Sequence, residues 1–272
     1  MNLNRERLDK ILCLQGFFTS REKAAAAVMA GCVQIKNEFV FKPGKKYPVS
    51  SVLSVKDSCP YVSRGGYKLA QAINDFKIIP EGKICLDIGA STGGFTDCLL
   101  QNKANLVYTV DCGTNQLAYS LRNNNRVICR ENYNARFIHA QDFSPLISLI
   151  VIDVSFISFL KILEPLAAEF LYNNPDLIIL IKPEFEAEKS MLCRGGVVKN
   201  IDDHKKIMER ILKILDSFNF NLKNFTFSNI TGAKSGNIEY LAYIKLLKES
   251  DNITLESCFS VVEKAFIFHQ KT

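Results

Sequence analysis

The most constraining feature of this sequence is an apolar run that breaks into a glycine-rich turn, at residues 84–96. Residues 84–88 predict a buried parallel strand, and 95–101 predict a helix. Glycines let the backbone approach a ligand, and the amides at a helix start can donate hydrogen bonds to it. Ser91 stands where G-x-G-x-x-G spacing needs its second glycine, so the turn favours a nucleoside ligand over a pyrophosphate. The alternative is a plain strand-to-helix turn.

Positive charge is concentrated near the start of the chain. The 272 residues carry a net charge of +6, and residues 1–60 hold ten Lys or Arg against five Asp or Glu. This asymmetry favours a polyanionic partner such as nucleic acid.

The cysteines and apolar runs exclude several classes of protein. None of the nine cysteines forms a C-x-x-C pair, and the three histidines lie far apart, so we expect no metal site. The cysteines are instead typical of small buried residues in a reducing compartment. The longest apolar runs, 146–151 and 177–181, are too short to span a bilayer, and the polar N-terminus is no signal peptide. We therefore expect a cytoplasmic protein.

The pattern of elements predicts two domains joined by a linker. Residues 1–58 predict a small α+β domain, 59–66 a linker, and 67–272 an α/β domain. In the first domain we expect helices over 5–15 and from a cap at Thr19 or Ser20 to Gly31, and strands at 33–36, 39–41 and 52–55.

Strands and helices alternate in the second domain, which predicts a mostly parallel sheet with helices on both faces. The last two strands leave no room for a helix between them, so we expect the last strand to be antiparallel. The expected strands are 84–88, 106–110, 127–130, 149–154, 178–181, 225–227 and 240–246. We expect one helix to begin near Tyr67 and further helices to cover 95–101, 116–122 and 202–218.

Polar residues follow several of these strands, at the edge where open α/β sheets bind ligands. Asp111 is placed to accept hydrogen bonds from ribose hydroxyls, although a turn residue is the simpler reading. Asp153 and Lys182 follow two later strands. Because burial lowers the pKa of a lysine, we expect a fraction of Lys182 to be neutral and able to accept a proton. A solvated charge is the alternative.

Lys68 and Glu239, taken singly, are typical of surface charges. With Asp153 and Lys182 they form the set Lys-Asp-Lys-Glu in chain order. Residues 83–247 resemble the FtsJ-type ribose 2′-O-methyltransferases, whose signature is this tetrad. The whole chain is similar to the TlyA family, whose members are known as haemolysin A-like proteins and as rRNA (cytidine-2′-O)-methyltransferases. The matching motifs are 63–69, 86–99, 153–158, 182–186, 195–198 and 235–239.

Residues 5–58 resemble the S4-like RNA-binding module, with a pattern at 7–9, Gly16, 20–21, Ala24, Gly31 and Val33. The resemblances together imply a Rossmann-like class I methyltransferase domain preceded by an S4-like RNA-binding domain. They imply ribosomal RNA or ribosomal subunits as partner, with no membrane. The cations expected to contact RNA phosphates are Arg5, Arg7, Arg21, Lys23, Lys36 and Arg64.

The resemblance also implies S-adenosylmethionine as cofactor and no metal. The residues expected to bind it are Asp87, Gly89, Ala90, Ser91, Thr92, Gly93, Gly94, Phe95 and Asp111. Lys182 is then the expected base, with Asp153 and Lys68 tuning its charge and Glu239 positioning Lys68 or the ribose. The expected substrate is cytidine in ribosomal RNA of one or both subunits. A membrane-active haemolysin and a non-catalytic ribosome-assembly factor are the alternatives.

Overall fold

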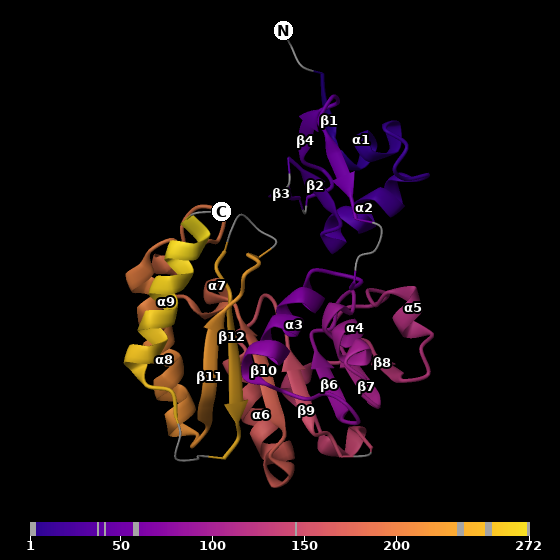
Figure 1. Cartoon of the computed structure of the whole chain (residues 1–272). Coiled ribbons are helices and arrows are strands. Elements are labelled where there is room, and N and C mark those ends of the chain that lie inside the picture. Colours follow the sequence, from indigo (N-terminus) through magenta and orange to yellow (C-terminus); the bar gives the residue numbers. More distant parts are fainter. Residues whose placement is uncertain are drawn as a thin grey trace.

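The N-terminal residues form a small unit above a large sheet domain in this computed structural model, as Figure 1 shows. The structure describes residues 4–36, 38–40, 42–56, 60–144, 146–232, 237–247 and 252–270. The expected strand 39–41 and the motif 235–239 extend outside these ranges. Elements of the small unit are β1 Arg5–Arg7, α1 Leu8–Leu14, α2 Arg21–Ala30, β2 Val33–Ile35, β3 Glu38–Phe39, β4 Lys46–Pro48 and β5 Leu53–Val55.

The first helix starts later than the sequence pattern predicts. Arg5–Arg7 is a strand that pairs antiparallel with β4, and α1 begins only at Leu8. The predicted apolar period, which starts at Leu8, is correct, but the residues before it are polar and contribute nothing to that face. The second helix begins as predicted, because the Ser20 hydroxyl accepts a hydrogen bond from the Lys23 amide at 3.3 Å. Gly31, with φ +80°, ends it.

A seven-stranded sheet forms the second unit, in the order β11-β12-β10-β9-β6-β7-β8. β12 runs in the direction opposite to the other six strands, so the prediction of a mostly parallel α/β sheet is confirmed. Its strands are β6 Ile84–Ile88, β7 Leu106–Val110, β8 Val127–Arg130, β9 Leu149–Ile152, β10 Asp176–Ile181, β11 Asn221–Phe227 and β12 Tyr240–Lys245.

Helices cover both faces of this sheet (Figure 1). They are α3 Gly65–Phe76, α4 Gly94–Gln101, α5 Tyr119–Arg122, α6 Leu160–Phe170, α7 Pro183–Glu186, α8 Ile201–Ser217 and α9 Leu255–Gln270. The sequence pattern did not predict α6 and α9. Pro165 lies in the interior of α6, where a proline argues against a helix, and apolar residues surround most of α9, which therefore lacks a clean amphipathic period.

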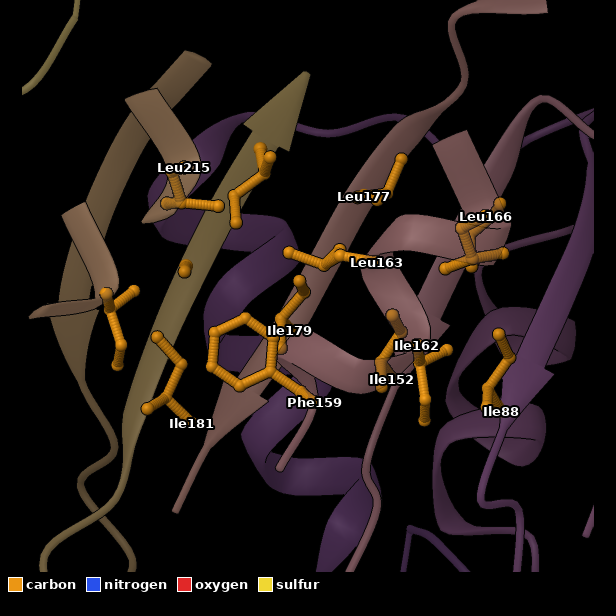
Figure 2. Close-up of a cluster of buried hydrophobic side chains, with 14 of the residues drawn as sticks. Ile88, Ile152, Phe159, Ile162, Leu163, Leu166, Leu177, Ile179, Ile181 and Leu215 are labelled. Carbon is orange, nitrogen blue, oxygen red and sulfur yellow. The ribbon is translucent and has the colours of Figure 1, made fainter. Parts of the chain in front are cut away.

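Alternating strand residues divide the core into two layers. Ile88, Ile152 and Ile179 point toward α6 and α8, where they pack with Phe159 and Leu163 (Figure 2). Their neighbours along the strands, such as Val151 and Leu180, point toward α3 and α4. The sheet is therefore buried on both faces, and ligands have access only to its edges.

The residues expected to form a linker pack against this domain. Helix α3 begins at Gly65, inside the 59–66 range, and Tyr61 and Val62 contact the core layer beside α3 and α4. The Val62 amide donates a hydrogen bond to Asp97 Oδ2 at 2.8 Å. This contact fixes the start of α3 and with it Lys68.

The structure also bears on the expectations for the cysteines, for metal binding and for membrane spans. Cys32 is disulfide-bonded, in contrast to the expectation of thiols alone, and seven other cysteines are thiols. In the described ranges, no group of His, Cys, Asp and Glu residues could hold a metal ion. No described helix is long and apolar enough to cross a bilayer.

Replacing Ile179 by alanine tests the core layer. Ile179 is fully buried in β10, so Ile179→Ala should lower the free energy of unfolding by about 2–5 kcal/mol. Urea unfolding followed by circular dichroism measures this loss. Ile267→Ala is the control, because Ile267 is 56% exposed on α9, and its effect should stay within about 0.5 kcal/mol. Equal losses in both variants would contradict the assignment.

Candidate active site

The turn after β6 is shaped by residues in the left-handed region. Gly89 has φ +83°, Ser91 +48° and Gly93 +95°. A Cβ on Gly89 would lie 2.6 Å from the carbonyl oxygen of Asp153. Only glycine therefore allows the turn after β6 and the loop after β9 to touch.

The carboxylates of Asp87 and Asp111 accept hydrogen bonds from residues in and beside this turn. Asp87 is fully buried, and Thr96 Oγ1 donates a hydrogen bond to its Oδ2 at 2.6 Å. Burial raises the pKa of Asp87 to about 7. Asp111, at the end of β7, accepts hydrogen bonds from the amides of Ser91 at 2.8 Å and Gly113 at 2.7 Å. Each Asp111 oxygen keeps a second lone pair for another donor.

Two adjoining cavities lie at the carboxyl edge of the sheet. The first has a volume of about 550 Å³ and the second about 390 Å³. They share the lining residues Gly89, Ser91, Asp153, Ser155 and Phe156. Most of the residues expected to bind S-adenosylmethionine, the methyl donor, line the first cavity. They are Gly89, Ala90, Ser91, Thr92, Gly94 and Phe95. Asp111 lines the second, whereas Asp87 and Gly93 lie behind the lining.

All four residues of the Lys-Asp-Lys-Glu set line the first cavity. Lys68, from the second turn of α3, forms a buried ion pair with Glu239, which directly precedes β12. Lys182 Nζ lies 2.7 Å from Asp153 Oδ1 and donates a hydrogen bond to Ser155 Oγ at 2.7 Å. Residues up to 171 positions apart thus meet as two ion pairs in one cavity.

The expectation that burial leaves part of Lys182 neutral is wrong. Burial does lower its pKa, but the carboxylates of Asp153, Glu239 and Glu184 act in the other direction. The net result is a pKa above the usual value for lysine, so Lys182 stays an ammonium in this structure.

Sequence reasoning missed Ser155 and Glu184 as site residues, although both stand beside residues that it named. Ser155 follows Asp153 by two positions, and Glu184 follows Lys182 by two. Both line the first cavity. Their closeness in sequence to strand-end residues was the signal that could have found them. Arg64, which is expected to contact RNA, also lines this cavity.

Two aromatic rings, one exposed and one half-buried, line the first cavity. Phe156 has φ +67°, which is rare for a bulky residue, and is 81% exposed. Its ring centroid lies 5.5 Å from that of Phe185, which also lines the first cavity. Strain and exposure together favour a functional role for Phe156.

A second contact fixes the loops that carry Asp153 and Lys182. The buried carboxylate of Glu186 accepts a hydrogen bond from Ser158 Oγ at 2.6 Å and another from the Phe159 amide at 3.0 Å. Glu186 in α7 therefore holds the far end of the loop after β9, at the point where α6 begins.

The N-terminal cations are only partly brought together. The guanidinium groups of Arg7 and Arg21 share Asp9, with closest contacts of 2.7 and 3.2 Å. Arg5 donates a hydrogen bond to the carbonyl of Lys46. Lys23 is exposed in the first turn of α2, whereas Lys36 follows β2. From the same unit, Met29, Lys42 and Pro43 reach the lining of the first cavity.

Comparison with known proteins places the chain in a methyltransferase family. The family model described as FtsJ-like methyltransferase matches residues 61–246. The chain belongs to this family. It is 44% identical to hemolysin A of Brachyspira hyodysenteriae, over 87% of this chain and 98% of that protein. It is 35% identical to the 16S/23S rRNA (cytidine-2′-O)-methyltransferase TlyA of Mycobacterium tuberculosis, over 89% of this chain and 90% of that one.

A solved structure covers nearly the whole chain. The putative hemolysin from Streptococcus thermophilus is 41% identical and covers 99% of this chain and 98% of its own, with a TM-score of 0.77. The expectation of a TlyA-type member of the FtsJ-like methyltransferases is therefore confirmed.

Removing the carboxylate beside Lys182 should lower the pKa of this lysine. Asp153→Asn deletes a negative charge 2.7 Å from Nζ, while burial still disfavours the ammonium. The rate of Lys182 acetylation, followed by mass spectrometry across pH, should then rise at lower pH than in the parent protein. Asp203→Asn, which removes an equal charge beside Lys206 on α8, is the control. Identical profiles for Asp153→Asn and the parent would refute the assignment.

Proposed function

We propose that this FtsJ-like methyltransferase transfers a methyl group from S-adenosylmethionine to the ribose 2′-hydroxyl of cytidine in ribosomal RNA. The observation that carries the proposal is the convergence of Lys68, Asp153, Lys182 and Glu239 beside the glycine turn. The substrate follows the name of the Mycobacterium tuberculosis relative, which covers both ribosomal subunits. A ribosomal substrate also implies the cytoplasm as the place of action.

The residues of the second cavity fit the donor. Ile88, Val110, Ala135 and Ile162 supply apolar lining for an adenine ring, and the open lone pairs of Asp111 suit ribose hydroxyls. Gly89 keeps the passage to the first cavity free of a side chain. When bound, the donor would supply an electrophilic methyl group.

Within the first cavity, the charged set positions and polarises the hydroxyl. Lys182, held by Asp153 and Ser155, is an ammonium and therefore acts as a hydrogen-bond donor to the 2′-oxygen. It stabilises the negative charge that develops as the proton leaves. Lys68 is fixed by Glu239 and adds a second positive charge at the same wall. Holding the hydroxyl in this position supplies much of the increase in the rate of methyl transfer.

RNA recognition combines the two units. A nucleotide inside a helix has to be extruded before its ribose reaches the cavity, and extruded bases stack on aromatic rings. Phe156 and Phe185 offer such rings at the rim. Lys42 and the paired guanidiniums of Arg7 and Arg21 supply positive charge on the N-terminal unit, where phosphates anchor the RNA.

Lys182→Ala tests the reaction. The variant should lose methyl transfer to ribosomal subunits by at least about a hundred-fold, because the charge that stabilises the transition state is gone. RNA affinity should change little. Radiolabelled donor with each isolated subunit, followed by mapping of 2′-O-methylcytidine, measures transfer, and filter binding measures affinity.

Lys206→Ala, at a position with 65% side-chain exposure on α8, is the matched control and should retain activity. Transfer that survives Lys182→Ala would overturn the role of Lys182. A parent protein that binds subunits without methylating either would instead favour the ribosome-assembly factor.

A methyl group at Gly89 tests the donor cavity. Gly89→Ala should weaken binding of S-adenosylhomocysteine by more than about ten-fold, because the new Cβ pushes the turn away from Asp153. Isothermal titration calorimetry measures the affinity. Gly82→Ala is the control, since Gly82 shares a positive φ of +73° but a Cβ there meets nothing within 4 Å. Equal loss in both variants would indicate general backbone strain and contradict the donor assignment.

A further inference from the structure

Helix α3 is joined to the sheet by a side chain that lies one turn beyond Lys68. Gln71 follows Lys68 by three residues, so both lie on the same side of the helix. The Gln71 Nε2 donates a hydrogen bond to the carbonyl oxygen of Phe227 at 2.8 Å. Its Oε1 accepts a hydrogen bond from the Asn229 amide at 2.9 Å. One carboxamide thus binds two backbone groups at the point where β11 ends.

Ser228, the residue between these two backbone groups, connects them to the Lys68–Glu239 pair. Its amide donates a hydrogen bond to the carbonyl oxygen of Glu239 at 2.9 Å, and both residues are buried. The Glu239 side chain forms the ion pair with Lys68. The contacts therefore run from α3 to the start of β12, across to the end of β11, and back to α3 one turn further on. They form a closed ring.

This ring fixes the place of Lys68 along the axis of α3. An ion pair alone leaves a lysine much freedom, because its four-carbon stem is flexible. Gln71 attaches the helix a second time, about 4.5 Å further along its axis, and does so to backbone atoms. Two attachments on consecutive turns oppose both sliding and rotation of α3 over the sheet.

The carboxylate of Glu239 has little room to follow a displaced helix. A Cβ on Gly232 would lie 2.7 Å from Glu239 Oε1, so the loop after β11 packs closely against this oxygen. The other oxygen, Oε2, faces Lys68. A shift of α3 would therefore lengthen the ion pair rather than carry the carboxylate along.

Apolar packing does not supply the same restraint. Leu69, Ala72 and Phe76 attach α3 to the core layer on one face of the sheet. Burial of apolar surface is non-directional, so it holds the helix on the sheet without selecting one position along it. Hydrogen bonds weaken steeply when their angles change, and the two bonds of Gln71 select that position.

We propose that Gln71 is a positioning residue for methyl transfer, which holds Lys68 against Glu239 at the wall of the first cavity. The inference rests on the proposed function. Gln71 is not among the described residues that line this cavity, so it acts on the reaction through Lys68. A misplacement of about 1 Å can lower the rate of an enzyme about a hundred-fold, even when its cause lies away from the reacting atoms.

Gln71→Ala tests the proposal in single-turnover methylation of the preferred subunit, with donor and RNA at saturation. The rate should fall about ten- to a hundred-fold, because Lys68 is no longer held beside the hydroxyl. Gln71→Met keeps the length of the side chain but neither hydrogen bond, and should lose as much. Asn74→Ala removes the same carboxamide from an exposed position of α3, where it contacts only Asp75, and should keep the parent rate.

A double-mutant cycle separates this role from general stabilisation of the helix. Glu239→Ala removes the ion pair, and Gln71→Ala is then measured in that background. Because Gln71 acts through the pair, its loss should lower the rate of the Glu239→Ala protein by less than about three-fold. A residue that only stabilises the fold would lower the rate by the same factor in both backgrounds.

Binding measurements complete the test. Affinities for S-adenosylhomocysteine and RNA should stay within about two-fold of the parent values in Gln71→Ala, since a positioning residue changes the chemical step. A parent-like rate in Gln71→Ala or Gln71→Met would overturn the proposal. So would equal factors in the two backgrounds, or a loss confined to donor or RNA affinity. Failure of the proposed function looks different, because the parent protein itself would then methylate neither subunit.

Discussion

The register of four neighbouring strands is the constraint on which the site depends. Ile88 pairs with Ile152, and two strands further along Ile181 pairs with Tyr240. Gly89, Asp153, Lys182 and Glu239 each lie one residue beyond these pairs, so the hydrogen-bond ladder itself brings the glycine turn and three of the four charged residues to one edge. A one-residue slip in any of these strands would turn the adjoining apolar side chains to the wrong core layer, which makes the register costly to change.

The antiparallel direction of β12 accounts for the position of Glu239. In a sheet with only parallel strands, a residue that precedes a strand lies at the opposite edge from residues that follow one. Because β12 runs the other way, Glu239 at its start meets Asp153 and Lys182 at the ends of β9 and β10. The sequence indicated this reversal through the missing crossover helix, whereas the tetrad was predicted from the resemblance to the FtsJ-type enzymes.

Other features depend on contacts between distant residues, which no pattern in the sequence reveals. The ionisation of Lys182 is decided by three carboxylates, two of which lie far from it in sequence, so burial alone predicted the wrong direction. The short strand Arg5–Arg7 exists because β4 pairs with it, and β4 carries no alternating apolar pattern. Arg64 was expected to contact RNA, and its place in the lining of the first cavity follows from the packing of residues 61–66 beside α4, which no sequence pattern shows.

The hydrogen bonds of Glu186 have a mechanical consequence. They join the far end of the loop after β9 to α7, while the ion pair of Lys182 joins its near end to β10. Phe156 lies between these two anchors, next to Ser155, which accepts a hydrogen bond from Lys182. The exposed ring is therefore carried by a loop whose two ends are fixed, and its position is tied to the same contacts that set the spacing of the ammonium and the carboxylate.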